Sequence, residues 1–180
     1  MSKDPYTAMV PPQRYEHHGR LVVVLDLDET LVYAREGPVL PRPGLEELLQ
    51  TLRELQCEVI VWTAGERDYA QEVLQRIDTA GVVQHCVYRH EKWWNGKAGY
   101  RKDITNLGRP MDLVLLVDNT PDCLRGHEDS SVLVSDFTSR TQNDSTLLSL
   151  ARLVRHIALS GLSVSKALAR SELVTEETEG

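Results

Sequence analysis

The fold is decided by residues 21–32, which read LVVVLDLDETLV. The first five residues of this stretch are apolar and three of them are valine, which is typical of a short strand buried on both faces of a sheet. Asp26 and Asp28 follow directly, with one residue between them. Because open parallel sheets bind ligands beyond the carboxyl ends of their strands, this pattern predicts a functional site at the end of the strand.

Two later apolar runs end in polar residues in the same way. EVIVW at 58–62 is followed by Thr63, and LVLLV at 113–117 is followed by Asp118 and Asn119. If the three strands are neighbours in one parallel sheet, their polar residues converge at a single edge.

The rest of the central chain alternates between the two kinds of pattern. Two shorter apolar runs, at 82–88 and 132–134, predict further strands. Apolar side chains recur at helical spacing in three segments: 45–55, 70–77 and 147–157, the last closed by Gly161. The alternation predicts an α/β fold with a central parallel sheet and helices on both faces.

Length and composition favour one globular domain with short tails. The chain has 180 residues, of which 41% are hydrophobic and 26% are charged. Residues 1–19 carry three prolines and no periodicity, so we expect a flexible N-terminal segment. Residues 163–180 end in EETEG and predict an acidic tail, which leaves 20–162 as the domain.

Several classes of protein are disfavoured. A net charge of −7 argues against direct nucleic-acid binding. The chain contains no run of 18 apolar residues, so we expect no transmembrane helix. Residues 1–20 lack the apolar core of a signal peptide. The three cysteines are odd in number and match no zinc pattern. We therefore expect reduced thiols and an intracellular location, cytoplasmic or nuclear.

The acidic residues at the strand ends predict a metal site. Asp26, Asp28 and Asp118 would repel one another in one crevice unless a cation lay between them, and carboxylate oxygens favour Mg²⁺. Asp26 could then attack phosphorus as a nucleophile, while Asp28 could protonate the leaving oxygen and later activate water.

A phosphoryl group at this site would need positive or N–H partners. Thr63 and Lys102 have suitable chemistry. Lys102 lies in the stretch 88–110, which contains six Lys and Arg residues and only two acidic residues. Thr63 could instead cap a helix, because Glu66 follows three residues later. Lys97 and Arg101 are alternatives to Lys102.

Two adjacent tryptophans stand out in the same basic stretch. Trp93 and Trp94 lie in a chain with only 6% aromatic residues. They could form an aromatic wall that contacts substrate, or at least one could anchor the loop to the core.

The motifs occur in an order that resembles a known family. After DLDETLV at 26–32 the matching motifs are Arg42-Pro43-Gly44, Trp62-Thr63-Ala64, Tyr100-Arg101-Lys102-Asp103-Ile104, Leu107-Gly108-Arg109, Val117-Asp118-Asn119-Thr120-Pro121 and Asn143-Asp144. Together they resemble the aspartate-nucleophile phosphatases of the haloacid dehalogenase superfamily, in the branch of small CTD phosphatases and Dullard-like, or NLI-interacting factor-like, phosphatases.

The resemblance implies a fold, a reaction and site residues. It implies a Rossmann-like haloacid dehalogenase fold without a large cap domain. It implies an Mg²⁺-dependent phosphoprotein phosphatase, a phosphoric monoester hydrolase acting on phosphoserine or phosphothreonine through an aspartyl-phosphate. It implies that Asp26 is the nucleophile and that Asp28 is the general acid and base. It implies that Mg²⁺ is bound by Asp26, the Leu27 carbonyl and Asp118. It also implies that Thr63 and Lys102 bind the phosphate, while Thr30 and Asn119 support the site.

The sequence also departs from that pattern. Small CTD phosphatases carry an inserted hairpin between the first motif and the Arg-Pro element, whereas only residues 33–41 fill that interval here. Trp62 stands where the family has phenylalanine, and Gly65 follows Thr63-Ala64. Two alternatives therefore stay open: a non-catalytic protein-binding module of the same fold, resembling mitochondrial import receptors, and a capless phosphatase for small metabolites.

Overall fold

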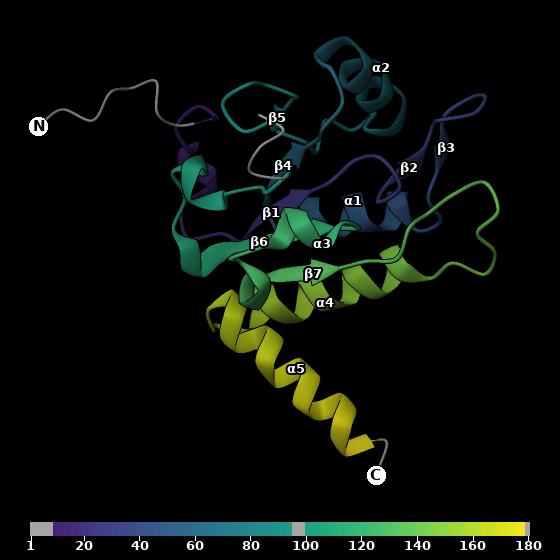
Figure 1. Ribbon diagram of the computed structural model, residues 1–180. Coiled ribbons are helices and arrows are strands. Elements are labelled where there is room, and N and C mark those ends of the chain that lie inside the picture. The colour runs from purple at the N-terminus through teal and green to yellow at the C-terminus, as the bar shows by residue number, and fades with distance from the viewer. Residues whose placement is uncertain (1–8, 95–99, 179–180) are drawn as a thin grey trace, which may run out of the picture.

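The computed structural model describes residues 9–94 and 100–178 and is built on one parallel sheet (Figure 1). The strand order is β5-β4-β1-β6-β7, and every neighbouring pair is parallel. The strands in chain order are β1 (Val22–Leu25), β4 (Glu58–Trp62), β5 (His85–Val87), β6 (Val114–Asp118) and β7 (Ser131–Leu133). All residues of β1, β4 and β6 are buried, which explains their unbroken apolar runs.

Long helices cover one face of the sheet. They are α1 (Leu45–Glu54), α2 (Arg67–Ile77), α4 (Thr146–Ser160) and α5 (Val164–Thr178). Alternate strand residues such as Val23 and Val59 meet the apolar stripes of these helices in the larger core. Gly161 ends α4 in the left-handed conformation, with φ of 69°, as the sequence predicts.

Short helices and the N-terminal segment cover the other face. The helices on this face are η2 (Ile104–Leu107) and α3 (Pro121–Leu124). Of the other short helices, η3 (Met111–Leu113) and η4 (Glu128–Ser130) contact α5, and η1 (Tyr15–His17) lies beside the residue Gln56 that follows α1. Val22, Ile60 and Leu116 point to this side and pack in a second core with Ile104 and Leu124. The predicted α/β fold, with helical cover on both faces, is confirmed.

The connection between β1 and α1 is a small hairpin. Strands β2 (Val32–Tyr33) and β3 (Leu40–Pro41) pair antiparallel and form a separate two-stranded sheet. Within the described residues no second domain is inserted here, in agreement with the prediction that a large cap is absent.

The two predicted tails differ from the structure. Val10 and His17 are buried, and the backbone N–H of Met9 donates to the Asn106 carbonyl at 3.1 Å, so residues 9–17 pack on the domain. Residues 164–178 form α5, whose Val164 and Leu168 are buried against the core. The acidic residues at the end of the chain suggested a tail, although the apolar residues at the start of this helix have helical spacing and pack against the core. Among the helices of the described residues, none combines the length and the hydropathy of a membrane-spanning segment.

Candidate active site

The three strand ends meet as the sequence predicts. Asp26 follows β1, Thr63 follows β4 and Asp118 closes β6, and β1 lies between the other two strands. The register pairs Leu25 with both Val61 and Val117, so Asp26 lies level with Asp118, and Thr63 comes one residue further along its strand.

Lys102 ties this cluster together from the stretch that precedes η2. Its Nζ donates to Asp26 Oδ1 at 2.9 Å, to Asp118 Oδ2 at 2.6 Å and to the Trp62 carbonyl at 2.7 Å. The side chain is almost fully buried. Of its two sequence alternatives, Arg101 donates to the Arg125 carbonyl instead, and Lys97 lies outside the described residues. Lys102 is therefore the lysine that reaches the carboxylates.

Burial sets the charge state of the cluster. Burial, together with the charge of Asp118, raises the pKa of Asp26 to about 6, although Lys102 opposes the shift. Burial alone would lower the pKa of Lys102, but the two carboxylates outweigh it and raise the pKa, so the ammonium stays charged. One ammonium thus faces two carboxylates, which leaves the cluster short of positive charge.

The loop after β1 orders the second oxygen of Asp26. Thr30 Oγ1 donates to Asp26 Oδ2 at 2.9 Å and lies 3.3 Å from Asn119 Oδ1. Asn119 Nδ2 in turn donates to Asp136 Oδ1 at 2.8 Å. Asp26 and the Asn119 amide oxygen therefore flank the same hydroxyl group, and the supporting role of Thr30 stays a prediction.

The Leu27 carbonyl is not placed to bind a metal, which corrects that prediction. It accepts the backbone N–H groups of Leu31 at 2.9 Å and Val32 at 3.2 Å, and these bonds use both of its lone pairs. The loop turns back on itself at Glu29, whose φ is 63°. Within the described residues no hydrogen bond to the Asp28 carbonyl occurs, so that oxygen is the more available one.

Asp118 is largely committed to protein contacts. Its Oδ1 accepts the Thr120 backbone N–H at 2.9 Å, and its Oδ2 accepts Lys102. No cluster of three His, Cys, Asp or Glu side chains suited to a metal is found in the described chain. A cation here would rely on mixed oxygen donors and retained waters, as Mg²⁺ does.

Asp28 lies on the side of the loop that faces α2. Its Oδ1 accepts a hydrogen bond from the Tyr69 hydroxyl at 2.5 Å. Burial, reinforced by the hydrogen bond to Asp28, raises the pKa of Tyr69, so the phenol stays protonated. Sequence reasoning missed Tyr69 because it reads as an ordinary packing residue of the helix.

Thr63 closes a tight turn instead of capping the helix. Its Oγ1 accepts the Gly65 backbone N–H at 2.9 Å, and the residue preceding α2 is Glu66. The phosphate contact expected of Thr63 stays a prediction.

A second residue that sequence reasoning missed is Arg42. Its guanidinium is buried, donates to Asp144 at 2.9–3.1 Å, and also reaches the carbonyls of Thr30 at 3.2 Å and Ser135 at 2.9 Å. It thereby fixes the loop after β1 to the loop after β7. The signal was present, because the Arg-Pro-Gly and Asn-Asp motifs carry both partners.

The two tryptophans have different environments. Trp93 is buried, packs edge-on against Trp62 and donates its indole N–H to the Tyr88 carbonyl at 2.7 Å, so it anchors the loop and does not form a substrate wall. Trp94 is half-buried and stacks on Tyr100 with ring centroids 3.9 Å apart. Its substrate contact stays a prediction.

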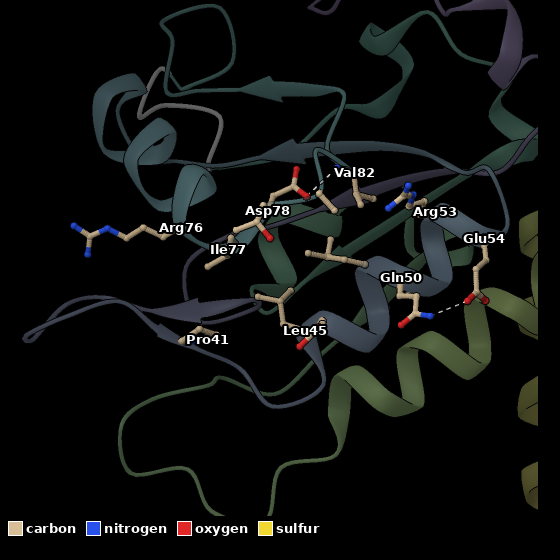
Figure 2. A pocket seen from close by; sticks show the side chains of 13 residues that line it. Pro41, Leu45, Gln50, Arg53, Glu54, Arg76, Ile77, Asp78 and Val82 are labelled. Carbon is tan, nitrogen blue, oxygen red and sulfur yellow. Dashed lines mark hydrogen bonds between the residues drawn. The ribbon is translucent and has the colours of Figure 1, made fainter.

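A cavity of about 760 Å³ lies elsewhere, between α1 and the end of α2 (Figure 2). Leu45 and Gln50 of α1 line one side, and Ile77 and Asp78 line the other. None of the predicted site residues lines it. The candidate chemistry therefore belongs to the strand ends and not to this cavity.

Comparisons with known proteins agree with this geometry. Residues 21–165 match the family model described as NLI interacting factor-like phosphatase. The chain is 31% identical to phosphatase PSR1 of Saccharomyces cerevisiae, covering 91% of this chain and 42% of that protein. It is 29% identical to the human carboxy-terminal domain RNA polymerase II polypeptide A small phosphatase 2, covering 86% of this chain and 63% of that protein. The chain spans about half the length of the curated relatives it matches.

A solved structure with little sequence similarity shares the fold. It is a provisionally assigned 3-deoxy-D-manno-octulosonate 8-phosphate phosphatase from Vibrio cholerae, 7% identical, with a TM-score of 0.50 over 79% of this chain and 87% of that chain. The fold, the buried lysine and carboxylate cluster and the family match lead to one conclusion: this chain belongs to the NLI interacting factor-like phosphatase family.

Proposed function

We propose that this chain hydrolyses phosphate monoesters on serine or threonine side chains of proteins through a covalent phosphate on Asp26. The observation that carries the proposal is the buried cluster of Asp26, Lys102 and Asp118 at the ends of three adjacent strands. A carboxylate held in a protein interior by one lysine is a preorganised nucleophile beside a fixed positive charge.

The reaction has two balanced steps. An Asp26 oxygen attacks phosphorus, the bond from phosphorus to the ester oxygen breaks, and Asp28 gives its proton to the departing alkoxide. Water then attacks the same phosphorus while Asp28 takes a proton back, and the bond to Asp26 breaks to release phosphate. Lys102 holds the Asp26 carboxylate in place during both steps and offsets the negative charge that gathers there.

The residues at the strand ends fit Mg²⁺. All available donors are hard oxygens: the Asp26 carboxylate, the Asn119 amide and the Asp28 carbonyl. Asp118 also lies nearby and accepts a hydrogen bond from Lys102. We favour Asn119 over Asp118 as a direct ligand because Asp118 is almost fully buried against Lys102, whereas Asn119 is partly exposed and its Oδ1 lies beside the hydroxyl group that contacts Asp26. Bound there, the ion would neutralise charge on the transferring phosphoryl group.

The protein substrate is supported by the short connection that follows β1 and by the relatives. Only the short β2–β3 hairpin separates β1 from α1, so a phosphorylated loop of another protein could reach Asp26. The human relative named above is a small phosphatase of the RNA polymerase II carboxy-terminal domain. An intracellular location and the absence of nucleic-acid binding stay predictions.

The test compares wild type and the Asp26→Asn variant on p-nitrophenyl phosphate and on phosphoserine peptides, with Mg²⁺ and with EDTA. We expect Mg²⁺-dependent hydrolysis by wild type, loss in the variant, and a phosphoryl group on Asp26 detected by mass spectrometry of quenched enzyme. Wild type that hydrolyses neither substrate would favour a non-catalytic binding module. Higher kcat/KM on small metabolites than on peptides would favour the metabolite phosphatase.

A further inference from the structure

Tyr69 connects the first turn of α2 to the loop after β1. It is the third residue of α2, and its hydroxyl donates to Asp28 Oδ1 at 2.5 Å. The two residues are 41 positions apart and lie on different elements, so the bond fixes the Asp28 side chain relative to the sheet. Asp28 is half-exposed and would otherwise be free to rotate about its side-chain bonds.

Gly65 makes room for this contact. A Cβ at residue 65 would lie 2.9 Å from Tyr69 Cδ1 and 3.3 Å from Tyr69 Cε1, which is closer than real Cβ contacts allow for the first atom. The φ of Gly65 is not in the left-handed region, so the backbone does not require glycine here. Glycine is required because a side chain at this position would collide with the Tyr69 ring. The Tyr69 ring can therefore lie directly against the turn that carries Thr63.

The direction of the hydrogen bond also assigns the two Asp28 oxygens. The phenol donates to Oδ1, and no hydrogen bond to Oδ2 occurs within the described residues. Oδ2 is therefore the oxygen left to exchange a proton with the substrate. A general acid works only when the oxygen that bears its proton faces the leaving group.

We propose that Tyr69 is a positioning residue that orients Asp28 so that Oδ2 delivers its proton to the leaving oxygen of the phosphate ester. This inference rests on the proposed function, since it assigns a partner to the general acid. Tyr69 keeps its own proton throughout. The proton that Asp28 transfers to the alkoxide is the one it regains from water in the second step.

The test uses leaving groups that differ in their need for a proton. Tyr69→Phe removes the hydroxyl and keeps the ring against Gly65. We expect kcat/KM of this variant to fall at least about tenfold more on a phosphoserine peptide, whose alkoxide needs a proton, than on p-nitrophenyl phosphate, whose phenolate does not. The ratio kcat/KM reports the first irreversible step, which includes departure of the leaving group.

Two further variants make the result decisive. Tyr88→Phe removes the hydroxyl of another half-buried tyrosine that lies outside the proposed catalytic groups, and its two kcat/KM values should stay in the wild-type ratio. Asp28→Asn should show the same leaving-group pattern as Tyr69→Phe, with a larger loss. An equal loss on both substrates in Tyr69→Phe would overturn the positioning role while leaving the proposed function intact. Wild type inactive on both substrates would overturn the proposed function and this inference with it.

Discussion

Asp26→Asn should stabilise the folded chain at neutral pH when no divalent cation is present. Burial raises the pKa of Asp26 to about 6 from an ordinary value of 3.8. Each unit of pKa difference corresponds to about 1.4 kcal/mol, so ionising Asp26 costs the folded state up to about 3 kcal/mol relative to the unfolded chain. Asparagine has the same shape and never pays this cost.

The contacts of Asp26 survive the substitution. An asparagine oxygen can still accept from Lys102, and its amide can donate to the Thr30 hydroxyl. Lys102 would then face only Asp118, which balances one positive with one negative charge. We therefore expect the free energy of unfolding to rise by about 1–3 kcal/mol.

The pH dependence has a definite sign. Because the folded pKa of Asp26 lies above its unfolded value, the folded chain binds the proton more tightly, and wild type loses stability as the pH rises from about 4 to about 6. The Asp26→Asn variant lacks this loss. The difference in unfolding free energy between the two proteins should be near zero at about pH 4 and reach its full size above about pH 6.

Urea denaturation of both proteins across this pH range, in EDTA, measures the effect. Added Mg²⁺ should raise the stability of wild type and leave the variant nearly unchanged, since binding to the folded state alone stabilises it. Asp112→Asn, at an exposed carboxylate, serves as control and should change stability by less than about 0.5 kcal/mol. A variant less stable than wild type at neutral pH in EDTA, or a difference that does not vary with pH, would refute the reasoning.

Three further predictions concern the same site. Lys102→Met should lower the free energy of unfolding by about 3–5 kcal/mol and kcat by at least about a hundredfold, because it leaves two buried carboxylates without their cation. Urea denaturation measures the first effect and steady-state kinetics the second. A stable, active variant would contradict the role assigned to Lys102. Arg42→Met should also lower the free energy of unfolding, measured by urea denaturation, by about 3 kcal/mol or more. Arg155→Met, at an exposed ion pair with Glu54, should lower it by less than about 1 kcal/mol. Equal losses in the two variants would show that Arg42 does not hold the two loops together. Hydrolysis of p-nitrophenyl phosphate should fall to background in EDTA and return with Mg²⁺, and activity that persists in EDTA would exclude a required cation.

The sheet and the meeting of its polar ends could be predicted because they follow from local pattern. A strand buried on both faces is apolar at every position, and its first polar residue marks where it leaves the core. Parallel neighbours then bring Asp26, Thr63 and Asp118 to one edge. Lys102 needed the resemblance to a family, since spacing alone did not separate it from Lys97 and Arg101.

Other features depend on backbone direction or on distant contacts. Which carbonyl of the loop after β1 turns inward depends on φ and ψ at residues such as Glu29, and for this reason the expectation for Leu27 was wrong. The hydrogen bonds of Tyr69 and Arg42 cross 41 and 102 residues of chain, so no periodicity announces them. The start of α5 was predictable in principle from Val164 and Leu168, which lie four residues apart.

The charge count at the strand ends gives a reason why one lysine would not be sufficient for the proposed phosphoryl transfer. Two carboxylates around one ammonium leave a single excess negative charge in a buried place, and a phosphate monoester would bring up to two more. At about 4 Å and an effective dielectric of about 20, each pair of like charges costs about 4 kcal/mol. Lys102 offsets only part of this repulsion, because it is already shared between Asp26 and Asp118. Burial raises the pKa of Asp26, and the same lack of solvent around the two carboxylates is the reason we expect a divalent cation to be needed before a phosphate can approach.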